Sequence, residues 1–137
     1  MEVDAFGVPV ALDEAALAAP EERVRAAVRA YLDGERRAFD VGVRYPDGLT
    51  GRTMRAMEDI PYGETRTYGD LAASLGTSPV AVGQACGRNP VPLVVPCHRV
   101  VAADGLGGFS AGGSDGRWLK RRLLAHERGQ RTLADCG

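Results

Sequence analysis

A cysteine and a histidine stand side by side in Pro96-Cys97-His98-Arg99-Val100, directly after the apolar run at residues 91–95. A thiol reacts as its thiolate, and a neighbouring imidazole can take the thiol proton. A free cysteine is more often a small buried core residue. Here, however, the polar side chains of His98 and Arg99 follow the cysteine at once, and a purely apolar core segment would not contain them. The stretch therefore favours a nucleophilic cysteine.

The longer segment around it strongly resembles the active-site segment of the O6-alkylguanine-DNA alkyltransferases, the methylated-DNA–protein-cysteine methyltransferases. The resemblance is carried by Gly87-Arg88-Asn89-Pro90-Val91-Pro92-Leu93-Val94-Val95-Pro96-Cys97-His98-Arg99-Val100-Val101. It extends from about residue 50 to residue 128 and is loose before that. It implies DNA repair by direct, stoichiometric transfer of the alkyl group from O6-alkylguanine in duplex DNA to Cys97. The base must be flipped out of the stack to be reached. O4-alkylthymine is a further candidate substrate.

The resemblance also implies five catalytic residues. Cys97 is the acceptor whose sulfur attacks the alkyl carbon, and His98 takes the thiol proton through a water. Glu127 orients the histidine, in the logic of nucleophile, base and orienting acid. Asn89 holds the loop before the cysteine. Tyr68 donates to the N3 side of guanine, so that the leaving base need not depart as an anion.

Contacts to the base and to DNA follow from the same resemblance. The base contacts are expected at Tyr68, Pro92, the backbone carbonyl of Val100, Phe109 and Ser110. The DNA contacts are expected at Ser78, Val80, Arg88 and Arg99. Where the family carries an arginine that inserts into the duplex, this chain has Val80. An apolar wedge can fill a vacated stack but cannot hydrogen-bond the orphaned cytosine. We therefore expect weaker DNA binding or slower flipping, with Arg88 as a partial substitute.

Without the resemblance, each of these residues has an ordinary structural interpretation. Glu127 is then a solvated carboxylate near a helix end, and Tyr68 is a half-buried helix residue. Asn89 is an Asx-turn before a proline, and His126 is a partner of the helix dipole.

Two other functions stay open at this point. Alkyltransferase-like proteins bind the lesion and recruit other repair factors without transfer; they lack the cysteine, which is present here as Cys97. Cys97 counts against this class, but Val80 and the reduced N-terminal part keep a weakly active or non-catalytic sensor as the alternative. A cysteine hydrolase using Cys97 and His98 is a third possibility, but the sequence shows no oxyanion hole for it.

Composition indicates about one ordinary domain in 137 residues. No apolar run approaches the length of a membrane span, and the acidic N-terminus is unlike a signal peptide, so we expect a cytoplasmic protein. The three cysteines, at 86, 97 and 136, form no metal-ligand pattern, and only two histidines accompany them. No G-x-x-x-x-G-K-[ST] motif is present. We expect no metal, no nucleotide cofactor and a monomer.

Charge is divided unevenly along the chain. Residues 1–49 hold six Lys/Arg and ten Asp/Glu, whereas residues 50–137 hold eleven and eight. The basic surplus therefore lies in the part that carries the motifs, which is compatible with phosphate contacts. The basic residues at 120–122 are equally well explained as a solvated helix face.

The fold class expected is α/β (α+β), with two parts. Residues 1–49 predict a small, shortened strand–helix–strand scaffold: an edge strand at 5–10, a helix from Pro20 to Leu32 and a strand at 39–43. We expect no catalytic constellation in it.

Residues 50–137 predict a mostly helical domain. Thr50 or Thr53 caps a helix to about Asp59, and a helix-turn-helix follows at about residues 67–88. A final helix at 118–127 begins after Ser114 or Asp115 and ends at Gly129, with a loose tail after residue 130.

Overall fold

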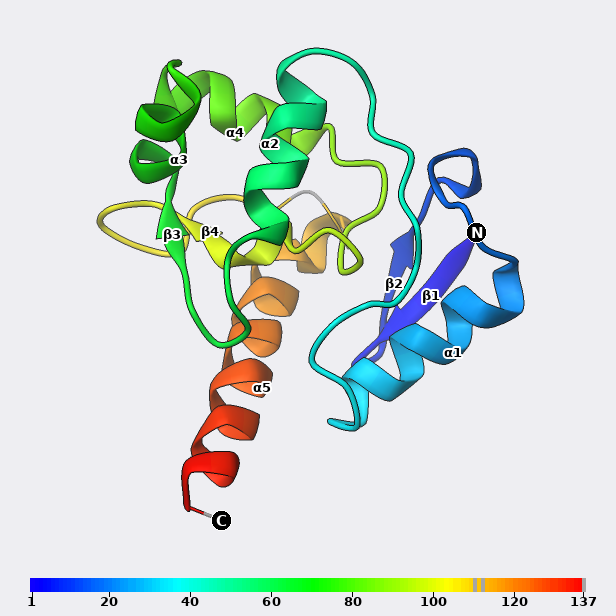
Figure 1. Ribbon diagram of the computed structural model, residues 1–137. Helices are drawn as coiled ribbons and strands as arrows, with labels where there is room; N and C mark the ends of the chain where they lie inside the picture. The colour runs from blue at the N-terminus through cyan, green and yellow to red at the C-terminus, as the bar shows by residue number, and fades with distance from the viewer. Residues whose placement is uncertain (110, 112, 137) are drawn as a thin grey trace.

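The computed structural model describes residues 1–109, 111 and 113–136, with side chains up to residue 129. Its N-terminal part is a hairpin covered by a helix (Figure 1). Strands β1 (Glu2–Ala5) and β2 (Val8–Ala11) pair antiparallel. Between them Phe6 and Gly7 both adopt positive φ, 53° and 86°, as a tight two-residue hairpin turn requires. The single edge strand predicted at 5–10 is therefore wrong, because the turn lies inside it.

Helix α1 (Glu21–Leu32) lies against this hairpin and buries Val24, Val28 and Tyr31, as the periodicity predicts. The strand predicted at 39–43 is wrong. The structure has only an isolated bridge there, between Val43 and Leu17. The partner Leu17 directly follows a 3-10 turn over Glu14–Ala16, so the pairing stays limited to the backbone hydrogen bonds from Ala18 N to Gly42 O and from Arg44 N to Ala16 O. The N-terminal part is thus hairpin and helix rather than strand, helix and strand.

Three short helices form the centre of the C-terminal part: α2 (Leu49–Glu58), α3 (Tyr68–Leu75) and α4 (Pro79–Gly87). Met54, Met57 and Ile60 are buried, as predicted. The N-cap of α2 is Gly48, however, and both candidate threonines lie inside the helix. Between α2 and α3, strand β3 (Arg66–Thr67) pairs in parallel with β4 (Val100–Val101), the segment just after the cysteine.

The predicted helix pair at 67–88 is confirmed as a structure. Thr67 and Asp70 form the capping box of α3, and Gly76 ends that helix in the left-handed conformation at φ 69°. Ser78 caps α4 through a hydrogen bond from Ala81 N, 3.2 Å long. These local signals are strong because each satisfies otherwise unpaired groups at a helix end.

Helix α5 (Gly116–Cys136) is the longest element and packs on the 3-10 turn Cys97–Arg99 (Figure 1). The predicted end at Gly129 is wrong, because the helix continues to Cys136, and the loose tail expected after residue 130 stays a prediction. Gly129 does not take the positive φ that a glycine cap needs. Leu119, Leu123 and Leu124 of α5 are buried.

One cluster of buried apolar side chains runs from Val3 in β1 to Leu123 in α5. The mixed α/β class is confirmed, and the division into domains at 1–49 and 50–137 stays a prediction. Within the described residues, no helix is both long enough and apolar enough to cross a membrane.

Candidate active site around Cys97

Cys97 lies in a 3-10 turn, lines a cavity of about 950 Å³ and is 7% exposed. The wall of this cavity comes from the β1–β2 hairpin, α4, the loop before the cysteine and the glycine-rich loop after β4. It includes Pro9, Ala11, Tyr68, Gly83, Cys86, Asn89, Pro92, Gly108 and Phe109. Tyr68, Asn89, Pro92 and Phe109, which the sequence resemblance singles out, are thus brought together with Cys97.

The thiol of Cys97 is protonated at neutral pH. Burial raises its pKa to about 11, although a hydrogen bond with Asn89 and the charge of Lys120 act in the opposite direction. A nucleophile in this state needs a base to remove its proton.

Asn89 fixes the loop that leads to the cysteine. Its Oδ1 accepts from Val91 N at 3.1 Å and its Nδ2 donates to Val95 O at 3.0 Å. The loop also contains Leu93 at φ 77°, a rare conformation for a non-glycine residue. Asn89 therefore forms an Asx-turn, and its two hydrogen bonds also hold the loop before Cys97 in place.

His98 and Glu127 form a fully buried pair, with Nε2 of the histidine 2.6 Å from Oε2 of the carboxylate. Burial lowers the pKa of His98. Burial would raise the pKa of Glu127, but hydrogen bonds and charge from His98 and Arg99 hold it well below its usual range. An ionised carboxylate only accepts, so Nε2 donates to it and the lone pair lies on Nδ1. Among the described residues, this buried Nδ1 has no hydrogen-bond partner.

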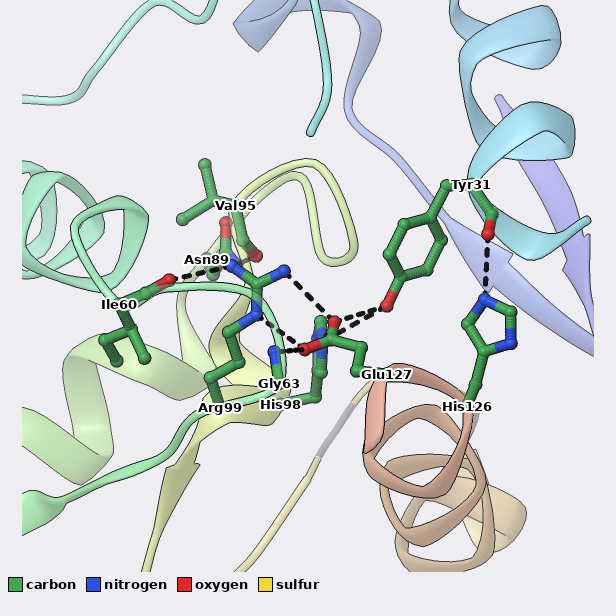
Figure 2. Close-up of polar contacts among 9 residues, drawn as sticks. All are labelled: Tyr31, Ile60, Gly63, Asn89, Val95, His98, Arg99, His126 and Glu127. Carbon is green, nitrogen blue, oxygen red and sulfur yellow. Dashed lines mark hydrogen bonds and ion pairs between the residues drawn. The ribbon is translucent and has the colours of Figure 1, made fainter. Parts of the chain in front are cut away.

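Arg99 belongs to this cluster and not to the DNA surface (Figure 2). Its Nε and Nη2 donate to Glu127 Oε1 and Oε2 at 2.9 and 3.1 Å, and its Nη1 donates to Ile60 O at 2.9 Å. The side chain is only 9% exposed. The burial of the guanidinium and its hydrogen bonds to Glu127 and Ile60 argue against the DNA contact expected for Arg99, which stays a prediction.

Tyr31 is a further member of this cluster, which the sequence did not predict. Its hydroxyl donates to Glu127 Oε2 at 2.5 Å and lies 3.4 Å from His98 Nε2. Figure 2 shows the ring reaching the carboxylate from α1, in the part where no catalytic constellation was expected. The helical periodicity marks this residue as buried, but no local signal reveals what its hydroxyl meets.

Lys120 was also missed as a site residue. It is fully buried, and its Nζ donates to Val100 O at 2.6 Å, to Gly108 O at 3.0 Å and to Tyr68 OH at 3.5 Å. Burial lowers its pKa to about 8. Lys120 therefore fits neither interpretation offered for residues 120–122, a phosphate contact or a solvated helix face. The helical spacing could have indicated this burial, because position 120 lies on the same helix face as positions 123, 124 and 127.

The predicted base contacts have different surroundings. Tyr68 is half-buried, and its hydroxyl donates to Gly108 O at 3.3 Å. The carbonyl of Val100 already accepts from Lys120, so a contact with the base would use its second lone pair. Ser110 lies outside the described residues.

The predicted DNA contacts other than Arg99 lie on the α3–α4 side. Val80 is 71% exposed at the start of α4, and Arg88 is exposed at its end. The hydroxyl of Ser78 is the α4 cap. In the described part of the chain, no group of three or more His, Cys, Asp or Glu side chains is placed to hold a metal ion.

Comparison with known proteins gives a consistent result. A family model described as 6-O-methylguanine DNA methyltransferase, DNA binding domain, matches residues 49–129. The methylated-DNA–protein-cysteine methyltransferase of Archaeoglobus fulgidus is 46% identical over 104 residues, which cover 71% of this chain and 68% of that protein. The Metallosphaera sedula protein of the same name is 43% identical, over 71% of this chain and 61% of its own length.

Solved structures agree with the sequence relatives. The crystal structure of the Mycobacterium tuberculosis O6-methylguanine methyltransferase matches with a TM-score of 0.71 and 38% identity, covering 82% of this chain and 70% of that one. A structure of Mycobacterium tuberculosis OGT in complex with DNA matches with a TM-score of 0.70 and 40% identity, covering 78% and 65%.

Proposed function

The chain belongs to the family of methylated-DNA–protein-cysteine methyltransferases, and we propose that it repairs O6-alkylguanine in double-stranded DNA by taking the alkyl group onto Sγ of Cys97. The observation that carries this proposal is the position of Cys97. It lines a cavity and is followed in the chain by His98, whose imidazole is held by the buried Glu127 carboxylate.

The first step is removal of the thiol proton. Because burial raises the pKa of Cys97 to about 11, the thiolate does not form unaided at neutral pH. His98 takes the proton on Nδ1 through a bridging water, and Glu127 stabilises the imidazolium that results. A low-pKa carboxylate suits this role, because it leaves the proton on the imidazole.

The second step is a direct displacement. A bond forms between Sγ and the alkyl carbon while the bond from that carbon to guanine O6 breaks, and the electron pair stays with the guanine. Tyr68 lines the cavity, and its hydroxyl turns its single proton from Gly108 O to the N3 side of the base, which limits the negative charge on the leaving base. The product is a thioether on Cys97, so each protein molecule acts once.

DNA binding is assigned to the α3–α4 pair, with the damaged base flipped into the cavity. The chain binds DNA, as the complex solved for its Mycobacterium tuberculosis relative supports. Val80 is exposed where a wedge into the duplex would have to stand. We also propose that the protein acts as a monomer and selects alkylated bases, with O4-alkylthymine as a second candidate.

The sensor alternative is the weaker one, because proteins of that kind lack the cysteine that here lines the cavity. Incubating the protein with a duplex that carries one O6-methylguanine, then digesting the DNA and quantifying its nucleosides, separates the two. Transfer predicts loss of one O6-methylguanine per protein molecule and the appearance of guanine. Lesion-selective binding with the methylated base unchanged would contradict the proposal.

A further inference from the structure

Tyr31 connects the N-terminal part to the candidate active site at two adjacent residues of α5. Its hydroxyl donates to the carboxylate of Glu127, 96 residues away, and its backbone carbonyl accepts from Nε2 of His126 at 2.8 Å (Figure 2). The ring packs against His126 and Phe39, with centroids 5.5 and 5.2 Å apart. The phenol is therefore held in one orientation from both ends.

The carboxylate that Tyr31 meets is saturated with donors. Oε1 accepts from Arg99 Nε at 2.9 Å and from Gly63 N at 3.1 Å. Oε2 accepts from His98 Nε2 at 2.6 Å, from Arg99 Nη2 at 3.1 Å and from the Tyr31 hydroxyl at 2.5 Å. Among these donors, only Tyr31 comes from the N-terminal part of the chain.

The Tyr31 hydroxyl shares Oε2 with the histidine that is assigned as the base. A carboxylate oxygen with several donors has a low proton affinity, so it holds the Nε2 proton of His98 without taking it. The hydroxyl also blocks rotation of the carboxylate away from the imidazole. Loss of this donor would leave Oε2 freer to move and more basic, and Nδ1 would then be a less well-oriented acceptor for the thiol proton.

We propose that Tyr31 is a positioning residue of the alkyl transfer, which acts on Cys97 through Glu127 and His98 and makes the N-terminal part a component of the active site. This inference rests on the proposed function. It assigns to α1 a role that the residues carrying the family resemblance, from about 50 to 128, do not supply.

The test compares Tyr31→Phe with wild type and with Tyr45→Phe. The phenylalanine keeps the packed ring and removes only the hydroxyl. Tyr45 is a matched control, because its hydroxyl also donates to a glutamate, Glu58, at 2.5 Å, but this hydrogen bond is exposed and neither residue lines the cavity of Cys97. For each protein, the single-turnover rate of methyl transfer at saturating lesion duplex and the dissociation constant of that duplex are measured.

We expect Tyr31→Phe to lower the saturating transfer rate by about tenfold, the effect of one hydrogen bond to a charged group, with the dissociation constant unchanged. Tyr45→Phe should match wild type in both. In a Glu127→Gln background, adding Tyr31→Phe should change the rate less than about twofold, because residues that act through one another are not additive.

A wild-type rate in Tyr31→Phe would overturn the inference, as would a loss confined to DNA affinity or rate losses that multiply in the double variant. If the wild-type protein itself transfers no methyl group, the proposed function fails and this inference fails with it. That outcome is distinguished from a failure of the inference alone, because it is seen with the wild-type protein before any variant is measured.

Discussion

The ammonium of Lys120 lies 2.6 Å from the carbonyl oxygen of Val100, in a position where the lysine is fully buried. A second hydrogen bond, 3.0 Å long, reaches Gly108 O in the glycine-rich loop. One side chain of α5 therefore links the strand after the cysteine to the glycine-rich loop, which lines the cavity. The buried ammonium therefore donates to backbone oxygens and is not exposed to DNA phosphates.

Replacing Lys120 with methionine should lower the free energy of unfolding by about 1–3 kcal/mol, because two buried carbonyl oxygens lose their donor. Urea denaturation followed by circular dichroism measures this. The matched control is Arg121→Met, an exposed neighbour on the same helix, for which the change should stay within about 0.5 kcal/mol. Equal effects at the two positions would contradict the assignment of Lys120 as the buried donor that joins Val100 to Gly108.

Stability should fall as the pH is lowered. Burial lowers the pKa of His98 below its ordinary 6.5, so near that pH the unfolded chain takes up a proton that the folded chain does not. The pKa of Glu127 is held well below its ordinary 4.5, which adds a further loss of the same sign at lower pH. The unfolding free energy at pH 5.5 should therefore be lower than at pH 7.5. In His98→Gln this pH dependence should be weaker, and an unchanged slope would show that His98 titrates normally in the fold.

Gly107 should be required for the position of Tyr68. It has φ 77°, and a Cβ there would stand 2.9 Å from Tyr68 Cε2 and 3.0 Å from the hydroxyl. Gly107→Ala would push the ring away from the cavity wall, and we expect the methyl-transfer rate to fall by about tenfold or more. Gly105→Ala is the control in the same loop, since a Cβ at that position meets nothing within 4 Å. Transfer at the wild-type rate in Gly107→Ala would argue against a role for Tyr68 in the reaction.

Val80→Arg should tighten binding to the lesion duplex and speed the transfer. The side chain is 71% exposed at the first turn of α4, and a guanidinium there could both occupy the vacated stack and hydrogen-bond the orphaned base. Fluorescence anisotropy and single-turnover rates measure the two effects. Ala26→Arg, on the exposed face of α1, controls for the added charge alone. If both arginines tighten binding equally, Val80 does not lie at the flipped base.

The features that the sequence predicts correctly are those decided within one helical turn. The capping box of Thr67 and Asp70 and the left-handed Gly76 fall in this class, because the groups that must be paired are three or four residues apart. The hairpin was missed for a related reason: Phe6 takes a positive φ that this residue type rarely adopts, so only Gly7 marked the turn.

Burial of charge could not be predicted from composition. Arg99 and Lys120 look like surface residues, and each is buried because it donates to acceptors supplied by segments distant in the sequence. Tyr31 is the extreme case, since its position on the buried face of α1 could be predicted but its partner Glu127 could not. The catalytic roles given to Cys97 and His98 stay predictions, for which the geometry supplies the reason to test them.

The most direct measurement of the central claim is the intact mass of the protein after incubation with a duplex that carries one O6-methylguanine, followed by peptide mapping. We predict a gain of one methyl group in place of one hydrogen, located on Cys97 and absent in Cys97→Ala. Cys86 lines the same cavity, but its thiol donates to Met57 Sδ at 3.6 Å and it is Cys97, not Cys86, that is followed in the chain by the His98–Glu127 pair, so Cys86→Ala should be methylated like wild type. An unchanged mass, or a methyl group on any residue other than Cys97, would contradict the account.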